Sequence, residues 1–309
     1  MKCLVTGGAG FIGTNLIKRL VNDGHEVISV DSYVTGKKEN HQDGCNYYNY
    51  DISSEHTLGI YVDHQSYPVW RELEYDIIFH IAALARIQPS LIDPMKNIKN
   101  NVLSTLHMLE YGRSKNIPIV YAGSSSKHHA PYGSAYAWSK WSGEQLCQLY
   151  NECYSLPTVI CRFYNVYGPY QLLDGAYATV LGIFERQYKN NETLTITSDG
   201  KQRRDFTHVD DIVNGLVKCA EGIKYSRENG ESTDHITGQE FELGSGVNYS
   251  INDVADMFGK DYPREYVPAR KGEYDKTLCT DMNAFELLNW KPERNLEEYI
   301  NNFLEDNDG

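Results

Sequence analysis

The sequence predicts an α/β fold in which helices cover both faces of a doubly wound parallel sheet. Apolar runs with the length of buried strands alternate with amphipathic, helix-length segments through residues 2–163. A glycine-rich turn at residues 7–13 joins the first strand to the first helix, and a carboxylate, Asp31, ends the second strand. In such folds a ligand binds at the carboxyl ends of the strands, where both features fall.

The first thirty-one residues form the most clearly defined unit. Lys2–Thr6 and Glu26–Val30 are predicted buried strands, and Gly24 ends the helix between them. The apolar face of that helix consists of Ile12, Leu16, Ile17, Leu20 and Val21. The turn fits two glycine patterns, which share Gly10 and Gly13 and begin at either Gly7 or Gly8.

This turn predicts a dinucleotide site. Glycine lets the backbone approach a pyrophosphate that rests on the helix N-terminus. The candidate contacts are Gly7, Gly10, Phe11, Ile12 and Gly13. Asp31 follows Gly13 at nearly the spacing expected for a carboxylate that binds the adenosine ribose, and it favours NAD over NADP because it repels a 2′-phosphate. An ordinary strand–turn–helix with a solvated aspartate is the weaker alternative.

The composition narrows the range of partners. The formal net charge is −13, which argues against nucleic acid and anionic membrane surfaces. No apolar run approaches the roughly 18 residues of a membrane span, and the chain starts within a predicted strand, so we expect no signal peptide. Seven cysteines, an odd number without a C-x-x-C pair, suggest reduced thiols and a cytoplasmic protein.

Further segments continue the alternation. We expect strands at 46–52, 77–83, 117–122 and 158–163, with helices at about 95–111 and 136–154. After Gly168-Pro169 the segments shorten, and we expect helices at 210–221, 283–288 and 296–304, a strand at 240–243 and a surface loop at 224–238. The expected organisation is an NAD-binding domain over 1–166, to which 204–246 return, and a smaller, partly interleaved substrate domain over 167–309.

Tyr136 and Lys140 are the candidate catalytic pair. A spacing of four places them on one helix face, where an ammonium favours the phenolate and makes Tyr136 a candidate acid or base. The triplet Ser124-Ser125-Ser126 follows a predicted strand, where a hydroxyl can bond a substrate oxygen. Alone, such a pair is more often a solvated helix face, but the dinucleotide turn upstream favours the catalytic interpretation.

Several longer motifs accompany these residues: Asp51-Ile52, His80-Ile81-Ala82-Ala83, Arg162-Phe163-Tyr164-Asn165-Val166-Tyr167-Gly168-Pro169, Arg204-Asp205-Phe206-Thr207-His208-Val209-Asp210-Asp211 and Arg270-Lys271-Gly272-Glu273. With the glycines, Asp31, the serines and the Tyr136–Lys140 pair, they resemble the extended short-chain dehydrogenases over nearly the whole chain. The resemblance is to the nucleotide-sugar epimerase and dehydratase branch, above all the UDP-hexose 4-epimerases. It implies a Rossmann fold with NAD as cofactor.

The resemblance also implies roles for matching positions. Cofactor contacts are implied for Ser32, Asp51, Ile52, Ala82, Ala83, Leu84, Tyr136 and Lys140, with Asp51 and Ile52 flanking the adenine. Arg204 and Arg270 would clamp the substrate diphosphate, Asn165 would touch it and Glu273 would bind the nucleoside ribose. Arg86 is a further candidate for substrate contact. For either clamping arginine considered alone, a surface salt bridge is the commoner role.

The histidines do not predict a metal site. His128 and His129 are adjacent in a loop without further ligands, so solvation or substrate contact is the better interpretation. His80 ends a buried strand and is expected to be a hydrogen-bonded core residue.

The segment from Ser124 to Tyr136 departs from the family pattern. It is shorter than in the relatives it resembles, so we expect one wall of the sugar pocket to be cut back. The shortening leaves open which serine is catalytic, with Ser124 the first choice and Ser125 the second.

The sequence therefore predicts an NAD-dependent epimerase that inverts C4 of a nucleoside-diphosphate hexose through a transient 4-keto sugar. The expected substrates are of the UDP-glucose or UDP-N-acetylglucosamine type, and a homodimer is expected. A 4,6-dehydratase or decarboxylase is the first alternative, disfavoured because Ser126 and Lys127 follow the serine where those enzymes carry an acid. The second is a non-catalytic NAD-binding sensor, disfavoured by Tyr136 and Lys140.

Overall fold

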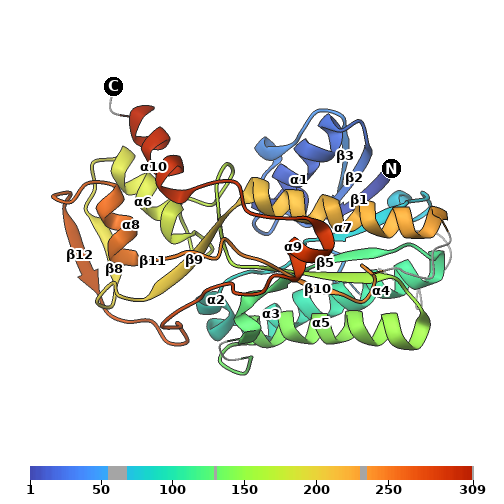
Figure 1. The fold of residues 1–309 in the computed structure, drawn as a ribbon. Helices are drawn as coiled ribbons and strands as arrows, with labels where there is room; N and C mark the ends of the chain where they lie inside the picture. Colours follow the sequence, from blue (N-terminus) through green and yellow to red (C-terminus); the bar gives the residue numbers. More distant parts are fainter. Residues whose placement is uncertain (55–67, 129–130, 230–234, 308–309) are drawn as a thin grey trace.

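The computed structural model describes residues 1–54, 68–128, 131–229 and 235–307 (Figure 1). Within these ranges seven strands form one parallel sheet, in the order β10-β6-β5-β4-β1-β2-β3. The strands are β1 (Lys2–Thr6), β2 (Glu26–Asp31), β3 (Cys45–Asn49), β4 (Ile77–His80), β5 (Ile119–Ser124), β6 (Thr158–Phe163) and β10 (Glu240–Leu243). This confirms the predicted doubly wound α/β class.

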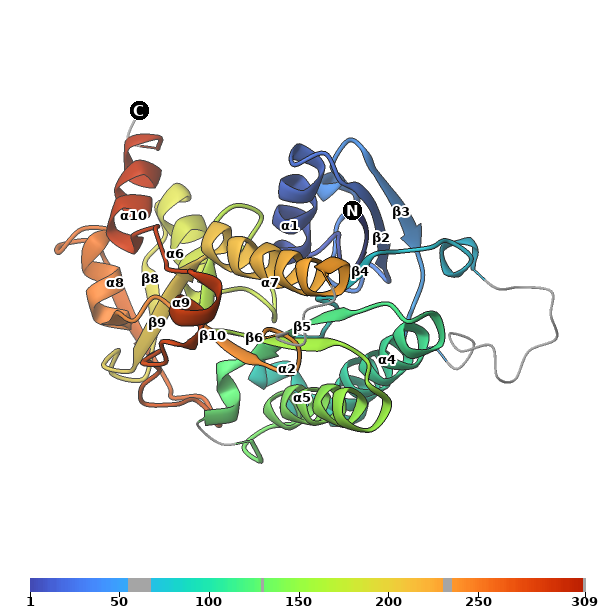
Figure 2. The ribbon, with the colours of Figure 1, turned by 45° about the vertical axis from the view of Figure 1, so that its right-hand side comes forward.

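Helices cover both faces of the sheet (Figures 1 and 2). One face carries α1 (Phe11–Asn22) and α7 (Val209–Asn229), and the other carries α4 (Ser104–Lys115) and α5 (Ala135–Tyr154). Side chains alternate between faces along a strand, so Cys3 and Val5 of β1 pack in the first core and Leu4 packs in the second. Burial on both faces explains why these strands are continuous apolar runs.

A second, smaller unit lies beside the sheet (Figure 1). Its strands are β7 (Asn165–Tyr167), β9 (Arg203–His208) and β11 (Asn248–Ser250) in one sheet, and β8 (Leu194–Thr197) and β12 (Arg264–Val267) in another. Its helices are α6 (Val180–Lys189), α8 (Ile251–Met257) and α10 (Leu296–Glu305), which share an apolar core. The short α9 (Asn283–Leu288) instead packs against the core of the large sheet.

Asp205 joins the two units. Its buried carboxylate accepts hydrogen bonds from Ser245 N at 2.8 Å, Ser245 Oγ at 2.7 Å, Gly246 N at 3.0 Å and Cys279 N at 2.9 Å. Ser245 and Gly246 follow β10 of the large sheet, whereas Asp205 lies in β9 of the small one. A charge with this many donors is compensated in the interior, and it fixes the two units around the space between them.

The structure corrects several predicted boundaries. The expected helix at 95–111 is divided into α3 (Pro94–Ile98), a π turn at Lys99–Leu103 and α4. Residues 224–229 continue α7 where a loop was expected, and 230–234 lie outside the described residues. The third strand ends at Asn49, before Asp51. No helix in the described ranges is long and apolar enough to cross a bilayer.

Candidate active site

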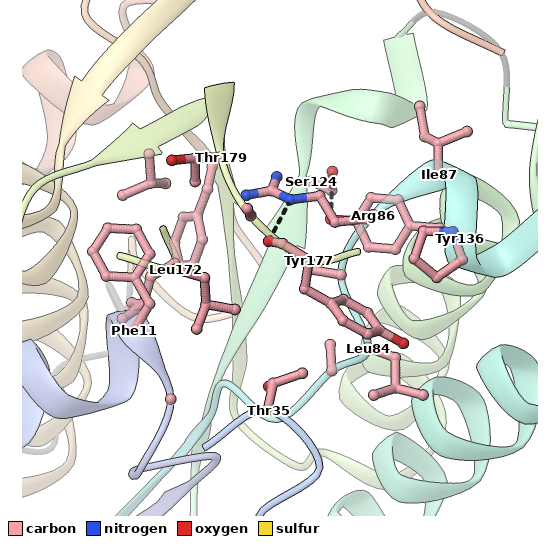
Figure 3. Close-up of a pocket in the computed structure, with 18 of the residues that line it drawn as sticks. Phe11, Thr35, Leu84, Arg86, Ile87, Ser124, Tyr136, Leu172, Tyr177 and Thr179 are labelled. Atoms are coloured by element: carbon pink, nitrogen blue, oxygen red, sulfur yellow. Dashed lines mark hydrogen bonds between the residues drawn. The ribbon is translucent and has the colours of Figure 1, made fainter. Parts of the chain in front are cut away.

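A cavity of about 800 Å³ opens where the carboxyl ends of the parallel strands meet the second unit (Figure 3). Every residue predicted from the sequence to bind cofactor or substrate, or to act in catalysis, lines this cavity. They are Gly7, Gly10, Phe11, Ile12, Gly13, Asp31, Ser32, Asp51, Ile52, Ala82, Ala83, Leu84, Arg86, Ser124, Ser125, Tyr136, Lys140, Asn165, Arg204, Arg270 and Glu273. The fold thus brings together positions spread over more than 260 residues of chain.

The glycine turn is closely packed and leaves the start of α1 open. Gly7 has φ +73°, and a Cβ there would lie 2.8 Å from the Ala82 Cα. A Cβ on Gly13 would lie 2.2 Å from the Gly7 carbonyl oxygen. Gly10, the N-cap of α1, makes no side-chain cap, so the first N–H groups of the helix face the cavity without one. Gly8 packs on Ser29 and Ile17 and is absent from the lining, which favours the Gly7 pattern.

Asp31 is held at the end of β2 by the same turn. Its carboxylate accepts hydrogen bonds from Ala9 N at 3.0 Å and Tyr33 N at 2.7 Å. Burial raises the pKa of the Asp31 carboxyl, against these two hydrogen bonds. The side chain is fixed at one edge of the cavity, where its remaining lone pairs can accept hydrogen bonds from a diol.

Ser124, Tyr136 and Lys140 all line the cavity. The Tyr136 hydroxyl lies 3.5 Å from Ser124 Oγ, which also accepts a 2.9 Å hydrogen bond from Ser126 Oγ. Lys140 is buried, with Nζ 4.3 Å from the centre of the Tyr121 ring, and burial lowers the pKa of Lys140 to about 8. The contact with Tyr136 favours Ser124 over Ser125 as the reacting serine.

A buried ion cluster lies behind Ser124 and was not predicted from the sequence. Glu144 Oε1 accepts a hydrogen bond from Ser124 N at 3.2 Å, and Oε2 accepts one from Arg162 Nε at 3.0 Å. Arg162 also pairs with Glu242 at 2.8 Å and with Glu240. Ser124, the last residue of β5, is therefore linked through Glu144 to Arg162 of β6, and Arg162 extends the cluster to β10.

The adjacent histidines 128 and 129 form no metal site within the described residues. His128 is exposed, which agrees with solvation, one of its two expected roles, and its Nε2 lies 2.7 Å from Glu242 Oε1 in the ion cluster. His129 lies outside the described residues. The described residues contain no group of three or more His, Cys, Asp or Glu side chains that could hold a metal ion.

His80 is the hydrogen-bonded core residue that was expected. Its ring contacts Thr6 Oγ1 at 2.8 Å and Thr105 Oγ1 at 3.1 Å. Burial lowers the pKa of His80 to about 3, so the ring stays neutral. It supports the strand ends beneath the cavity and takes no part in the lining.

Four of the five predicted substrate-binding residues line the cavity from the second unit. Arg204 donates from Nη1 to the Arg203 carbonyl at 2.9 Å and interacts electrostatically with Glu273. Arg270 and Glu273 are exposed at the rim. Asn165 donates to the Asp205 carbonyl at 3.1 Å and to Thr277 Oγ1 at 3.2 Å, so its amide is partly committed to the protein.

Arg86 differs from Arg204 and Arg270 in its backbone conformation. It follows β4 and caps the short helix α2 (Ile87–Ile92) with φ +113° and ψ +139°, a region that residues with a Cβ rarely adopt. Such strain costs of order 1–3 kcal/mol and persists only where the surroundings enforce it. Leu84, two residues earlier, is held by Asn101 Oδ1 on its N–H at 2.7 Å and by Asn97 Nδ2 on its carbonyl at 2.9 Å.

The cavity also has a wall that the sequence did not indicate. Residues 172 and 175–179, between β7 and α6, and the first two residues of α6 line it from the second unit, and Tyr177, Leu172 and Thr179 face it in Figure 3. Tyr274 completes the rim near Arg204, with which it interacts electrostatically. The segment after Gly168-Pro169 has neither helical nor strand periodicity, so no pattern in the sequence marked it as part of the site.

Comparison with known proteins decides the family. The NAD dependent epimerase/dehydratase family matches residues 3–230. The chain belongs to this family. UDP-glucose 4-epimerase of Mycolicibacterium smegmatis is 30% identical, over 97% of this chain and 96% of its own. Protein CapI of Staphylococcus aureus is 27% identical, over 99% of this chain and 98% of its own.

Solved structures agree with that assignment. UDP-glucose 4-epimerase of Thermotoga maritima, solved with UDP-glucose, has a TM-score of 0.85 at 27% identity, covering 99% of this chain and 98% of that chain. The predicted family and fold are thereby confirmed, and so is NAD as the cofactor of this epimerase/dehydratase family member. Its residues fit NAD: an uncapped helix N-terminus faces the cavity for the pyrophosphate, and Asp31 offers a fixed carboxylate for the ribose.

The choice of dinucleotide should depend on Asp31. Because a carboxylate bonds a ribose diol and repels a 2′-phosphate, we expect the protein to prefer NAD over NADP. Asp31→Ala should narrow that preference by about 10–100-fold, the value of a charge-assisted hydrogen-bonded pair. Titration of both cofactors into protein stripped of dinucleotide measures it, and Asp31→Asn separates loss of charge from loss of the contact with Ala9. Equal affinity of the unsubstituted protein for both cofactors would contradict the assignment.

Proposed function

We propose that the protein is an NAD-dependent epimerase that inverts C4 of a nucleoside-diphosphate hexose. The observation that carries the proposal is one cavity lined by Tyr136, Ser124 and Lys140, by a dinucleotide turn, and by Arg204 and Arg270, for which the described residues provide no ion pair. Residues 1–166, with 204–246, would hold NAD, and residues 167–309 would hold the nucleotide sugar. Two of the three relatives named above are UDP-glucose 4-epimerases, which supports the proposal.

The residues divide the reaction between them. NAD supplies a reversible store for the hydride of C4. Tyr136 takes the proton of the 4-hydroxyl and returns it, and Ser124 donates a hydrogen bond to the 4-oxygen. Lys140 adds positive charge beside the phenolate. Arg204 and Arg270 hold the diphosphate while the 4-keto sugar turns to present its other face.

The placement of acids favours epimerisation over elimination. A dehydratase needs a further acid or base to remove water across C5 and C6. Residues 124–136 contain no Asp or Glu. The carboxylate behind Ser124, that of Glu144, binds Arg162 and is absent from the cavity lining. No free carboxylate is therefore available for a second proton transfer among the described residues beside the serines.

Proton NMR of UDP-sugars incubated with the protein tests the function. We expect the anomeric signal of one C4 epimer to give rise to that of the other, with UDP-glucose and UDP-N-acetylglucosamine in the panel. A stable 4-keto-6-deoxy or pentose product would replace the proposal with the dehydratase or decarboxylase alternative. No reaction with UDP-, GDP-, CDP- and dTDP-sugars would favour a non-catalytic sensor.

The diphosphate clamp makes its own prediction. Arg204→Ala and Arg270→Ala should each raise KM by about 10–100-fold and change kcat much less, because the diphosphate is bound equally in the ground and transition states. Steady-state kinetics with the active UDP-sugar measures both constants. An unchanged KM in both variants would mean that the diphosphate lies elsewhere.

We also propose a cytoplasmic homodimer. Leu149 and Tyr154 of α5 are apolar and exposed, and a second copy could cover them. The cysteines are all free thiols, as a reducing compartment would require. Light scattering on the protein as it elutes from a size-exclusion column measures the oligomeric state. A monomer at micromolar concentration would contradict this part of the proposal.

A further inference from the structure

Three guanidinium groups line the cavity, and none has a carboxylate within ion-pair distance among the described residues. They belong to Arg86, Arg204 and Arg270. In contrast, arginines outside the cavity such as Arg19 and Arg264 pair with Asp23 and Asp256. Unpaired cations in a partly dehydrated space are expected where an anion binds. The two negative charges of a substrate diphosphate would balance Arg204 and Arg270. Arg86 would then remain without a counter-charge.

The third arginine lies near the proposed catalytic tyrosine. Arg86 interacts electrostatically with the Tyr136 phenol, the group that acts at C4. Arg204 interacts electrostatically with Glu273, Tyr274 and Asp275, in the segment that follows β12. Figure 3 shows the Arg86 side chain inside the cavity, in the group that contains Ser124, Tyr136 and Tyr177. A charge near C4 reaches the substituents of the sugar ring rather than the nucleoside.

The guanidinium of Arg86 is fixed in position with its outer nitrogens free. Nε donates to the Tyr177 carbonyl at 3.0 Å, and within the described ranges Nη1 and Nη2 have no hydrogen-bond partner. One bond at Nε sets the plane of the group and leaves two donors for a planar acceptor. The strained backbone of Arg86 is held by the buried Asn97 and Asn101 through Leu84. Strain retained in a binding site often serves to position a side chain.

We propose that Arg86 binds a carboxylate on the hexose, so that the preferred substrate is a nucleoside-diphosphate hexuronic acid. This rests on the proposed epimerase function and narrows its sugar. The carboxylate of a hexuronic acid is C6, attached to C5, the neighbour of the reacting C4. A carboxylate at that position can accept two parallel hydrogen bonds from the free edge of the guanidinium while C4 faces Tyr136.

Kinetics with a matched pair of substrates tests the inference. We expect kcat/KM for UDP-glucuronate to exceed that for UDP-glucose, and Arg86→Met to lower the ratio of the two by about 10–100-fold. Arg86→Gly should lower it similarly in a protein that folds well, because glycine adopts φ +113° without strain. Arg86→Lys should recover part of the ratio. Arg227, an exposed arginine outside the cavity that donates to the Asn116 carbonyl, supplies the control Arg227→Met, which should leave the ratio unchanged.

Binding measurements separate failure of the inference from failure of the proposed function. In the Tyr136→Phe background, calorimetry with UDP-glucuronate, UDP-glucose and UDP alone does not require turnover. Tighter binding of UDP-glucuronate that disappears with Arg86→Gly supports the carboxylate site even if no sugar is epimerised. Equal weakening of all three ligands by Arg86→Gly would place the guanidinium on the diphosphate, and weaker NAD binding would place it on the cofactor. Either result overturns the inference.

Discussion

Tyr136→Phe should abolish nearly all turnover while leaving the fold and NAD binding intact. The substitution removes one hydroxyl from a half-buried ring and leaves the packing of α5 unchanged. That hydroxyl is the group proposed to exchange a proton with the 4-oxygen, and it already lies 3.5 Å from Ser124 Oγ. A positioned acid or base typically contributes about 10²–10⁴-fold in rate, so kcat should fall by that factor.

The matched control for this experiment is Tyr132→Phe. Tyr132 lies four residues before Tyr136, in the connection between β5 and α5. It is 78% exposed and packs edge-on against Trp141, outside the cavity. Its substitution should leave kcat unchanged. Lys140→Met offers a second check, because it removes a charge that burial disfavours and should lower kcat without unfolding the protein. A fully active Tyr136→Phe enzyme would refute the mechanism.

The site was predictable where local chemistry demanded particular residues. A backbone with φ +73° packed on Ala82 calls for glycine at position 7, and a buried parallel strand such as Ile77–His80 calls for a continuous apolar run. The spacing of Tyr136 and Lys140 follows from helix geometry alone. Each of these features depends on residues that are close together in the sequence, so a local pattern is enough to predict it.

Elements stabilised by distant partners were not predictable in this way. β9 (Arg203–His208) begins with charged residues that do not suggest a strand. It forms because Arg203 binds Asn248 and Asp253, and because the Asp205 carboxylate finds its donors at residues 245, 246 and 279. The strained backbone of Arg86 left no sign in the sequence either, since glycine would be the expected residue there.

The ion cluster behind Ser124 was invisible for the same reason. Arg162 lies opposite Glu242 on the neighbouring strand β10, Glu240 stands two residues away on the same face, and Glu144 comes from α5. Each charged residue alone reads as a surface group. Arg162 and the two glutamates of β10 come together because the chain leaves β6, passes through much of the second unit and returns as β10. Sequence periodicity does not predict this pairing of strands.

Arg162 should therefore be among the most sensitive positions for stability. Its side chain is 4% exposed and pairs with three carboxylates, one of which, on Glu144, is fully buried. Burial raises the pKa of the Glu144 carboxyl even with Arg162 present, and for Glu242 the hydrogen bonds from His128 and Arg162 outweigh burial and lower the pKa. Removing the guanidinium leaves these charges facing one another. We expect Arg162→Met to lower the free energy of unfolding by about 3–5 kcal/mol, measured by urea denaturation.

The pH dependence of that loss identifies its cause. Without Arg162, burial acts on Glu144 with less opposition, so its pKa in the folded protein should rise further above the unfolded value of about 4.3. An acid whose folded pKa is raised destabilises the protein above its pKa and ceases to do so as pH falls through that value. The destabilisation by Arg162→Met should thus be larger at pH 8 than at pH 5.5, and adding Glu144→Gln should recover part of it at pH 8. Arg19→Met, which removes an exposed helix pair with Asp23, should change stability by no more than about 0.5 kcal/mol at either pH. If the loss at Arg162 is the same at both pH values and insensitive to Glu144→Gln, it comes from packing of the arginine stem rather than from an uncompensated carboxylate.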